Sequence, residues 1–165
     1  MAQLANPDVR LRDVEDTDLD IFFTQQLDPD ANWMAAFTAK DPGDHAAFLA
    51  HWARIRADPV NIIKTVLVGD QVAGHVSSYE EEPGRPEVTY WLGREFWGQG
   101  IATAALTLFL ANLLTTRPVY ARVAQDNPGS LRVLTKCGFT IVGEGSGYAN
   151  ARQAETMEYL LRRDS

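Results

Sequence analysis

Two glycines lie close together near the middle of the chain. Gly98 and Gly100 follow a strand-like stretch that ends at Leu92, and directly precede an apolar stretch over residues 101–114. Glycine lets the backbone approach a ligand closely, and the first amides of a helix point outward with partial positive charge. A strand, a glycine turn and a helix start in this order predict a binding site for a phosphate group.

Two common phosphate-binding motifs do not fit this segment. A nucleoside triphosphatase loop ends in Gly-Lys-Ser or Gly-Lys-Thr, and the chain contains no such ending. In a dinucleotide fold the first glycine closely follows the strand, whereas residues 94–97 intervene here. Asp126 is placed like a ribose-binding acid, but the 39 residues after it are too few to complete a parallel sheet. A nicotinamide-dependent dehydrogenase is therefore the weakest of the functions considered.

A second signal lies 25 residues after Ala102, in the stretch from Asn127 to Phe139. Asn127 is a good helix cap, Pro128 suits the first helical position, and Gly138 stands just beyond the expected end. The stretch predicts a short helix whose first turn carries Ser130.

The remaining patterns predict a mixed fold. Strands are expected over residues 9–12, 62–68, 72–79, 87–92, 119–124, 139–142 and 156–161. Helices are expected from Leu19 to Leu27, from a cap at Asp41 to Pro59, over residues 101–114 and after Asn127, with residues 30–34 as a connection. This order predicts an α/β (α+β) fold with a mixed, mostly antiparallel sheet of about seven strands and helices on both faces.

Composition predicts one domain over residues 1–165. The chain is 45% hydrophobic and 22% charged, which allows a sizeable core and excludes a disordered or disulfide-stapled class. The apolar stretch over residues 101–114 is too short to span a membrane. Cys137 is the one cysteine, and no signal peptide follows Met1, so we expect a cytoplasmic protein.

Charge is unevenly distributed along the chain. The net charge of −7 argues against nucleic acid as a partner. Residues 1–93 hold 16 acidic and 7 basic side chains, whereas residues 94–165 hold 6 acidic and 8 basic ones. The first part therefore favours a cationic ligand and the second an anionic one, although most of these charges can equally be solvated surface.

These motifs together resemble the GNAT superfamily of acetyl-CoA-dependent N-acetyltransferases, over nearly the whole chain. The resemblance is carried by Trp97-Gly98-Gln99-Gly100-Ile101-Ala102 and by the stretch from Asn127 to Phe139. The run Glu87-Val88-Thr89-Tyr90-Trp91-Leu92 before the turn resembles the Rim-type branch, which contains ribosomal-protein N-terminal acetyltransferases.

The resemblance implies a site for acetyl-CoA. The pyrophosphate would bind the backbone amides of Gly98, Gln99, Gly100, Ile101, Ala102 and Thr103. After Leu92 the strand would splay away from its neighbour and admit the pantetheine arm, with Asn127 and Ser130 lining the other side. A backbone amide near Leu92 or Gly93 could hold the oxyanion. Trp97 stands where many members have Gln or Arg, so Arg94 could supply the missing phosphate contact. Leu134 stands where many members have a tyrosine that protonates the departing thiolate.

Acetyl transfer requires a neutral amine. Deprotonating a lysine amine at pH 7 costs ~4.6 kcal/mol, against about 1–1.4 kcal/mol for an α-amino group. Glu87 is the candidate base, on the same strand face as Thr89 and Trp91, and His75 is its rival. Each has an ordinary alternative, a solvated edge glutamate and a histidine packed in the sheet. Ser130 or a water could complete the transfer to sulfur, or Ser130 could be a plain first-turn residue.

The acceptor site is expected around Trp33, Met34, Tyr79 and Glu87, although core packing is an equal alternative for the first two. The expected acceptor is a cationic amine: a peptide N-terminus, a polyamine or an amino sugar. His45 and His51 are six residues apart, which is off helical spacing, so no metal is expected. A homodimer is plausible from the exposed end strands. The alternative function is a non-catalytic acyl-CoA-binding or partner-binding module.

Overall fold

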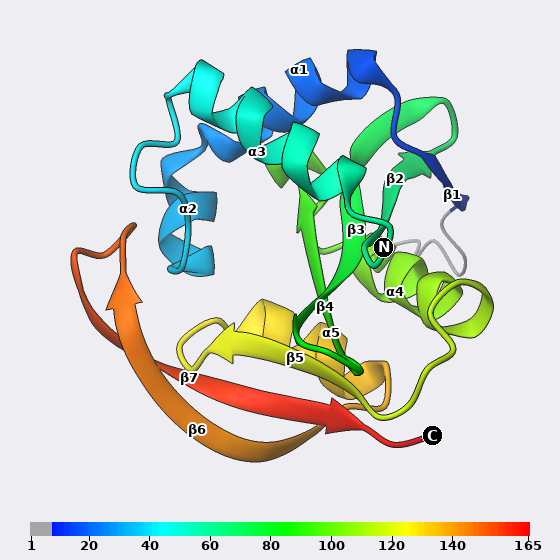
Figure 1. Ribbon diagram of the computed structural model, residues 1–165, viewed down its shortest axis with the longest axis vertical. Helices are drawn as coiled ribbons and strands as arrows, with labels where there is room; N and C mark the ends of the chain where they lie inside the picture. Colours follow the sequence, from blue (N-terminus) through cyan, green and yellow to red (C-terminus); the bar gives the residue numbers. More distant parts are fainter. Residues whose placement is uncertain (1–7) are drawn as a thin grey trace.

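The strands of the computed structural model, which describes residues 8–165, form one sheet in the order β1-β2-β3-β4-β5-β7-β6 (Figure 1). They are β1 (Val9–Asp13), β2 (Ile62–Val68), β3 (Gln71–Glu82), β4 (Arg85–Leu92), β5 (Val119–Ala124), β6 (Thr140–Ala149) and β7 (Ala154–Arg163). Every neighbouring pair is antiparallel except β4 and β5, which are parallel. The expected mixed, mostly antiparallel sheet of seven strands is confirmed.

Helices cover both faces of the sheet, as expected. They are α1 (Asp16–Gln26), α2 (Pro29–Ala35), α3 (His45–Ala57), α4 (Ile101–Asn112) and α5 (Pro128–Lys136), with a short 3-10 turn at Arg94–Phe96. Phe22 of α1 and Trp52 of α3 pack on one face, against Ile63. Phe109 of α4 and Leu134 of α5 pack on the other face, in a cluster that includes Val76 and Val88 of the sheet.

The connection expected over residues 30–34 is instead part of helix α2. Pro29 occupies its first turn, and the Asp28 side chain caps it by accepting from the amides of Asp30 and Ala31. The expectation was wrong because proline both ends a helix and suits the first turn of the next one. The α2 cap shows that here Pro29 begins a helix.

The cap expected at Asp41 was also wrong. Asp44 caps α3 by accepting from the amide of Ala47, and the helix begins at His45. Asp41 instead bonds the amide of Gly43 in a turn before the helix. Both aspartates suit a cap, but Asp41 closes a turn by accepting from the amides of Gly43 and Asp44, so the helix begins only after Asp44.

The last two strands are longer than expected. β6 continues from Thr140 to Ala149 through Gly143, Gly145 and Gly147, which usually weaken a strand. β7 runs beside it from Ala154 to Arg163, and the two pair along nearly their whole length. The continuous antiparallel pairing therefore outweighs the low strand propensity of the glycines.

A buried ion pair ties the first strand to the first helix. Asp18 is 2% exposed and accepts two hydrogen bonds from the Arg12 guanidinium, at 2.7 and 2.9 Å. It also accepts from Thr65 Oγ1 at 2.7 Å and from the Glu15 amide at 2.9 Å. Burial raises the pKa of Asp18, but these hydrogen bonds outweigh it and hold the pKa below its ordinary value.

We expect Asp18→Asn to lower the free energy of unfolding by about 2–4 kcal/mol, because the Arg12 charge loses its buried partner. Urea denaturation of both proteins measures the difference. Asp20→Asn, on the exposed side of the same helix, is the control and should change stability by less than about 0.5 kcal/mol. Equal losses in the two variants would contradict the assignment.

Candidate active site

The site is built at the junction of β4 and β5. These strands pair at a single position, Glu87 with Tyr120, whereas β1 and β2 pair at five positions. Beyond Glu87 the two strands diverge (Figure 1). Because their facing backbone groups then lack strand partners, the splay offers hydrogen bonds to an extended ligand arm.

The turn after β4 is open, as a phosphate site requires. Gly98 and Gly100 have φ of 73° and 77°, in the left-handed region that favours glycine. A Cβ placed on either would meet no atom within 4 Å. Gly100 caps α4 without a side-chain hydrogen bond, so the first amides of α4 have no cap partner. The turn therefore presents unpaired backbone amides to an anionic group such as a phosphate.

Side chains of the turn stabilise its shape. Trp97 Nε1 donates to the carbonyl of Leu92 at 3.0 Å, and Gln99 Nε2 donates to the carbonyl of Glu95 at 2.8 Å. Ile101 is buried in the core, while Ala102 and Thr103 are partly exposed. Backbone amides are therefore the groups that this turn offers to a ligand.

Arg94 is engaged with carboxylates from the start of α2. Its Nε and Nη2 donate to the two Asp28 oxygens at 2.8 and 2.6 Å, and Nη2 also pairs with Asp30. Gly93, the residue before it, is buried and donates its amide to the carbonyl of Ala73. A phosphate contact by Arg94 would have to compete with both aspartates.

Glu87 lies at the narrow end of the splay, where it is 3% exposed. Its Oε2 accepts from the Tyr79 hydroxyl at 2.7 Å and its Oε1 from Arg122 Nε at 3.2 Å. Burial and this carboxylate raise the pKa of Tyr79 well above its ordinary value, so the phenol stays protonated. Each carboxylate oxygen retains a lone pair for a further donor.

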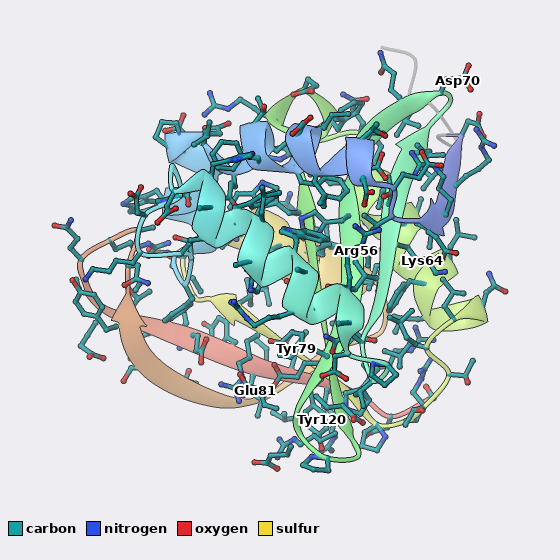
Figure 2. All side chains as sticks on the ribbon, turned by 45° about the horizontal axis from the view of Figure 1, so that its top comes forward. Arg56, Lys64, Asp70, Tyr79, Glu81 and Tyr120 are labelled. Atoms are coloured by element: carbon teal, nitrogen blue, oxygen red, sulfur yellow. The ribbon has the colours of Figure 1, made fainter. Side chains whose placement is uncertain are left out.

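Two more carboxylates surround Arg122. Glu81 lies 3.5 Å and Glu158 3.6 Å from its guanidinium nitrogens. Burial raises the pKa of Glu158, against the lowering effect of Arg122. In Figure 2, Tyr79, Glu81 and Tyr120 lie close together below α3. Three carboxylates around one guanidinium leave this face of the splay negatively charged, which favours a cationic ligand.

Asn127 and Ser130 lie at the start of α5, as predicted. Asn127 Oδ1 accepts from the Ser130 amide at 3.2 Å, and its Nδ2 donates to the carbonyl of Met34 at 3.2 Å. Ser130 Oγ accepts from the Tyr90 hydroxyl at 3.0 Å. The start of α5 therefore contacts β4 through Ser130 and α2 through Asn127.

Trp33 and Met34 lie on α2, which is fastened to the far half of the sheet. The Arg152 guanidinium stacks on the Trp33 ring at 4.0 Å, and its Nε donates to the Trp33 carbonyl at 2.9 Å. Arg152 Nη1 also pairs with Asp126 at 2.6 Å. Trp33 nevertheless remains 49% exposed to solvent.

His75 lies apart from this group. Its ring packs at 4.7 Å from Phe22 and 4.9 Å from Trp52, and its Nδ1 is buried without a hydrogen-bond partner among the described residues. It pairs across the strands with Trp91, about 13 Å along β4 from Glu87 at the usual rise per residue. Burial lowers the pKa of His75 to about 4. The geometry matches the packed-histidine alternative.

Sequence reasoning missed Arg122, Tyr90 and Arg152. Their contacts with Glu87, Ser130 and Asp126, respectively, each join residues at least 26 positions apart in the sequence. Alternation along a strand shows only which face of the sheet a side chain occupies, not which distant residue it meets. The alternation in residues 87–92 does place Tyr90 on the face opposite Glu87, and that is the one available signal.

Within residues 8–165, no group of three or more His, Cys, Asp or Glu side chains is placed to hold a metal ion. Over the same residues, no helix has the length and apolar character needed to cross a membrane.

The comparison with protein families finds one match. A family model described as an acetyltransferase (GNAT) domain matches residues 8–140. Among curated proteins, no sequence matches the chain.

Solved acetyltransferases share the fold. Mycobacterium smegmatis RimJ in complex with CoA-disulfide has 20% identity and a TM-score of 0.80, over 95% of this chain and 82% of that one. Spermidine N-acetyltransferase from Vibrio cholerae, in complex with CoA and spermine, has 19% identity and a TM-score of 0.77, over 94% and 96%. Ribosomal-protein-S5-alanine acetyltransferase from Vibrio fischeri has 18% identity and a TM-score of 0.74, over 99% and 97%.

The environment of His75 predicts a loss of stability in acid. Below pH 6.5 the unfolded chain binds a proton at this ring, whereas the folded chain binds it only near pH 4. The contribution of His75 to the free energy of unfolding is therefore unchanged above pH 6.5. Between pH 6.5 and 4 the free energy of unfolding falls by about 1–3 kcal/mol. Urea denaturation across this range measures the fall.

His75→Phe keeps the aromatic packing and should lose this part of the pH dependence. His45→Phe, on the exposed surface of α3, should retain it. A pH dependence that is identical in wild type and His75→Phe would contradict the assignment.

Proposed function

The chain belongs to the GNAT acetyltransferase family, and on that premise we propose that it acetylates a positively charged primary amine with Glu87 as the general base. Membership makes it an acetyl-CoA-dependent N-acetyltransferase. The observation that carries the proposal is the position of Glu87. This buried carboxylate lies where β4 and β5 part, within a cluster of acidic side chains that also contains Glu81 and Glu158.

The proposed reaction is a direct transfer. Glu87 takes the proton of the ammonium group, directly or through a water, so that the amine lone pair is free to attack the thioester carbonyl. Arg122 and the Tyr79 hydroxyl hold the Glu87 carboxylate in place. The amides of the Gly98–Gly100 turn bind the pyrophosphate. The Gly93 amide already donates to the carbonyl of Ala73, so it is not free to stabilise the oxyanion.

An α-amino group is the acceptor that fits this base best. Glu87 is a weak base, and an α-amine costs only about 1–1.4 kcal/mol to deprotonate at pH 7. The likeness to RimJ and to a ribosomal-protein-S5-alanine acetyltransferase supports the Rim-type branch, while the likeness to a spermidine acetyltransferase supports a polyamine. We therefore propose a peptide N-terminus first, with residues 1–165 acting as one domain.

An amine panel tests the function. We expect acetyl-CoA and the full chain to release free thiol with peptides bearing a free N-terminus, and calorimetry to detect coenzyme A binding. Binding without thiol release from peptides, polyamines or amino sugars would instead indicate a non-catalytic acyl-CoA-binding module. No heat with coenzyme A would overturn the assignment of the turn.

Removal of the base should slow transfer strongly. We expect Glu87→Gln to lower kcat by about 10²–10⁴ at pH 7, with coenzyme A affinity unchanged. The deficit should shrink as pH rises, because solvent then deprotonates the amine. Glu144→Gln, exposed on β6, is the matched control. A kcat within twofold of wild type would show that Glu87 is not the base.

The negative charge of Glu81 should lower the KM for a positively charged acceptor. We expect Glu81→Gln to raise the KM of a dicationic acceptor about two- to fivefold at low salt, and less as salt screens the charge. Glu82→Gln is the matched control, because Glu82 is similarly exposed but pairs with Arg85 at 3.5 Å, away from Arg122. Equal effects of the two changes would refute a specific role of Glu81.

A further inference from the structure

The hydroxyl groups of Tyr90 and Ser130 meet between β4 and α5. Tyr90 donates to Ser130 Oγ at 3.0 Å, and the Ser130 amide is held by the Asn127 cap at 3.2 Å. Both residues are partly buried. The contact therefore joins the strand that precedes the glycine turn to the first turn of a helix on the other side of the splay.

This hydroxyl pair and the carboxylate of Glu87 lie on opposite faces of the sheet. Glu87 bonds Tyr79 on the face that α1 and α3 cover, where Ile63 packs with Phe22. Tyr90 is three residues further along β4, and it packs with the cluster under α4 and α5. A ligand arm in the splay would thus meet a base on one face and a hydroxyl pair on the other.

The direction of the hydrogen bond leaves one hydrogen free. A phenol is a stronger donor than an alcohol, and here Tyr90 donates to Ser130. Burial raises the pKa of Tyr90, so the phenol keeps its proton at neutral pH. Because Ser130 Oγ already accepts this bond, its own O–H is free to donate, and no described residue accepts from it.

We propose that Tyr90 is a positioning residue that aims the Ser130 hydroxyl at the sulfur of acetyl-CoA during acetyl transfer. The inference rests on the proposed function and adds a role to it. Ser130 is suited to this role because no other residue on the same face of α5 carries a hydroxyl. The residues that follow it on that face, at helical spacing, are Val133, Leu134 and Cys137.

Ser130 and Tyr90 both keep their protons throughout the proposed transfer. The amine lone pair forms the C–N bond, the C–S bond breaks, and its electron pair goes to sulfur. The nitrogen loses two protons: Glu87 takes the first before the attack and passes it to solvent, and then takes the second as the C–S bond breaks. The Ser130 O–H donates a hydrogen bond to the developing thiolate, which takes a proton from solvent on release. Hydrogen bonds to charged groups are stronger than those to neutral groups, so the contact strengthens as the bond breaks.

The thiol of bound coenzyme A is the direct probe. We would titrate the ultraviolet absorbance of its thiolate in complexes of wild type, Tyr90→Phe, Ser130→Ala and Tyr159→Phe, beside free coenzyme A. Tyr159→Phe is the matched control, since Tyr159 packs against the same cluster and has no hydrogen bond to Ser130 among the described residues. Steady-state kinetics with the best amine of the panel accompany the titration.

We expect the bound thiol of wild type and of Tyr159→Phe to titrate at lower pH than that of free coenzyme A. In Ser130→Ala it should return to the free value, and in Tyr90→Phe most of the way. We expect kcat to fall about tenfold in Ser130→Ala and about three- to tenfold in Tyr90→Phe, with acceptor KM unchanged. The double variant should equal Ser130→Ala, and Ser130→Thr should restore kcat.

The failures of the two proposals are distinguishable. If wild type binds coenzyme A and acetylates no amine, the proposed function is overturned. If wild type turns over but neither variant shifts the thiol titration, the role of Tyr90 and Ser130 is overturned. Losses that add in the double variant would show that Tyr90 acts independently of Ser130. Thermal melting of each variant checks the fold, and Ser130→Thr keeps the test valid should Tyr90→Phe unfold.

Discussion

The single paired position between β4 and β5 is the constraint on which the site depends. Parallel strands that start side by side and then part leave backbone donors and acceptors without partners, and a ligand can supply those partners. The chain runs from the end of β4 directly into the glycine turn, while Glu87 lies at the narrow end, where the two strands still pair. A sheet paired along its full length here would have no room for a ligand between its halves, whatever its side chains.

Helix α2 links the two sides of this opening. At its start, the capping residue Asp28 pairs with Arg94, which directly precedes the glycine turn. At its end, the carbonyls of Trp33 and Met34 accept hydrogen bonds from Arg152 and Asn127. A change at the cofactor turn would therefore reach the residues proposed for the acceptor through short, charged contacts rather than through the core.

The chemistry divides between the two faces of β4. Carboxylates gather on the face of α1 and α3, where the proposed reaction would stabilise an ammonium group and remove its proton. Hydroxyls gather on the face of α4 and α5, where the sulfur would leave. Leu134 suggested that the site lacks a hydroxyl for the thiolate, yet Tyr90 brings one to Ser130 from the strand. Successive side chains of a strand point to opposite faces of the sheet, so Glu87 and Tyr90, three positions apart, can serve the amine on one face and the sulfur on the other.

Local patterns in the sequence determined the glycine turn, the Asn127 cap, the positions of the strands along the chain and most helices, because each depends on neighbouring residues only. The resemblance of these patterns to one family also predicted that Glu87, Ser130 and the glycine turn belong to the same site. The start of α2, the cap of α3 and the length of β6 were decided by packing, since proline, aspartate and glycine each fit two local structures. Only the tertiary structure could bring Arg122 to Glu87, Tyr90 to Ser130 and Arg152 to Trp33. Such contacts depend on register and on how far two strands diverge, and no short-range pattern encodes either quantity.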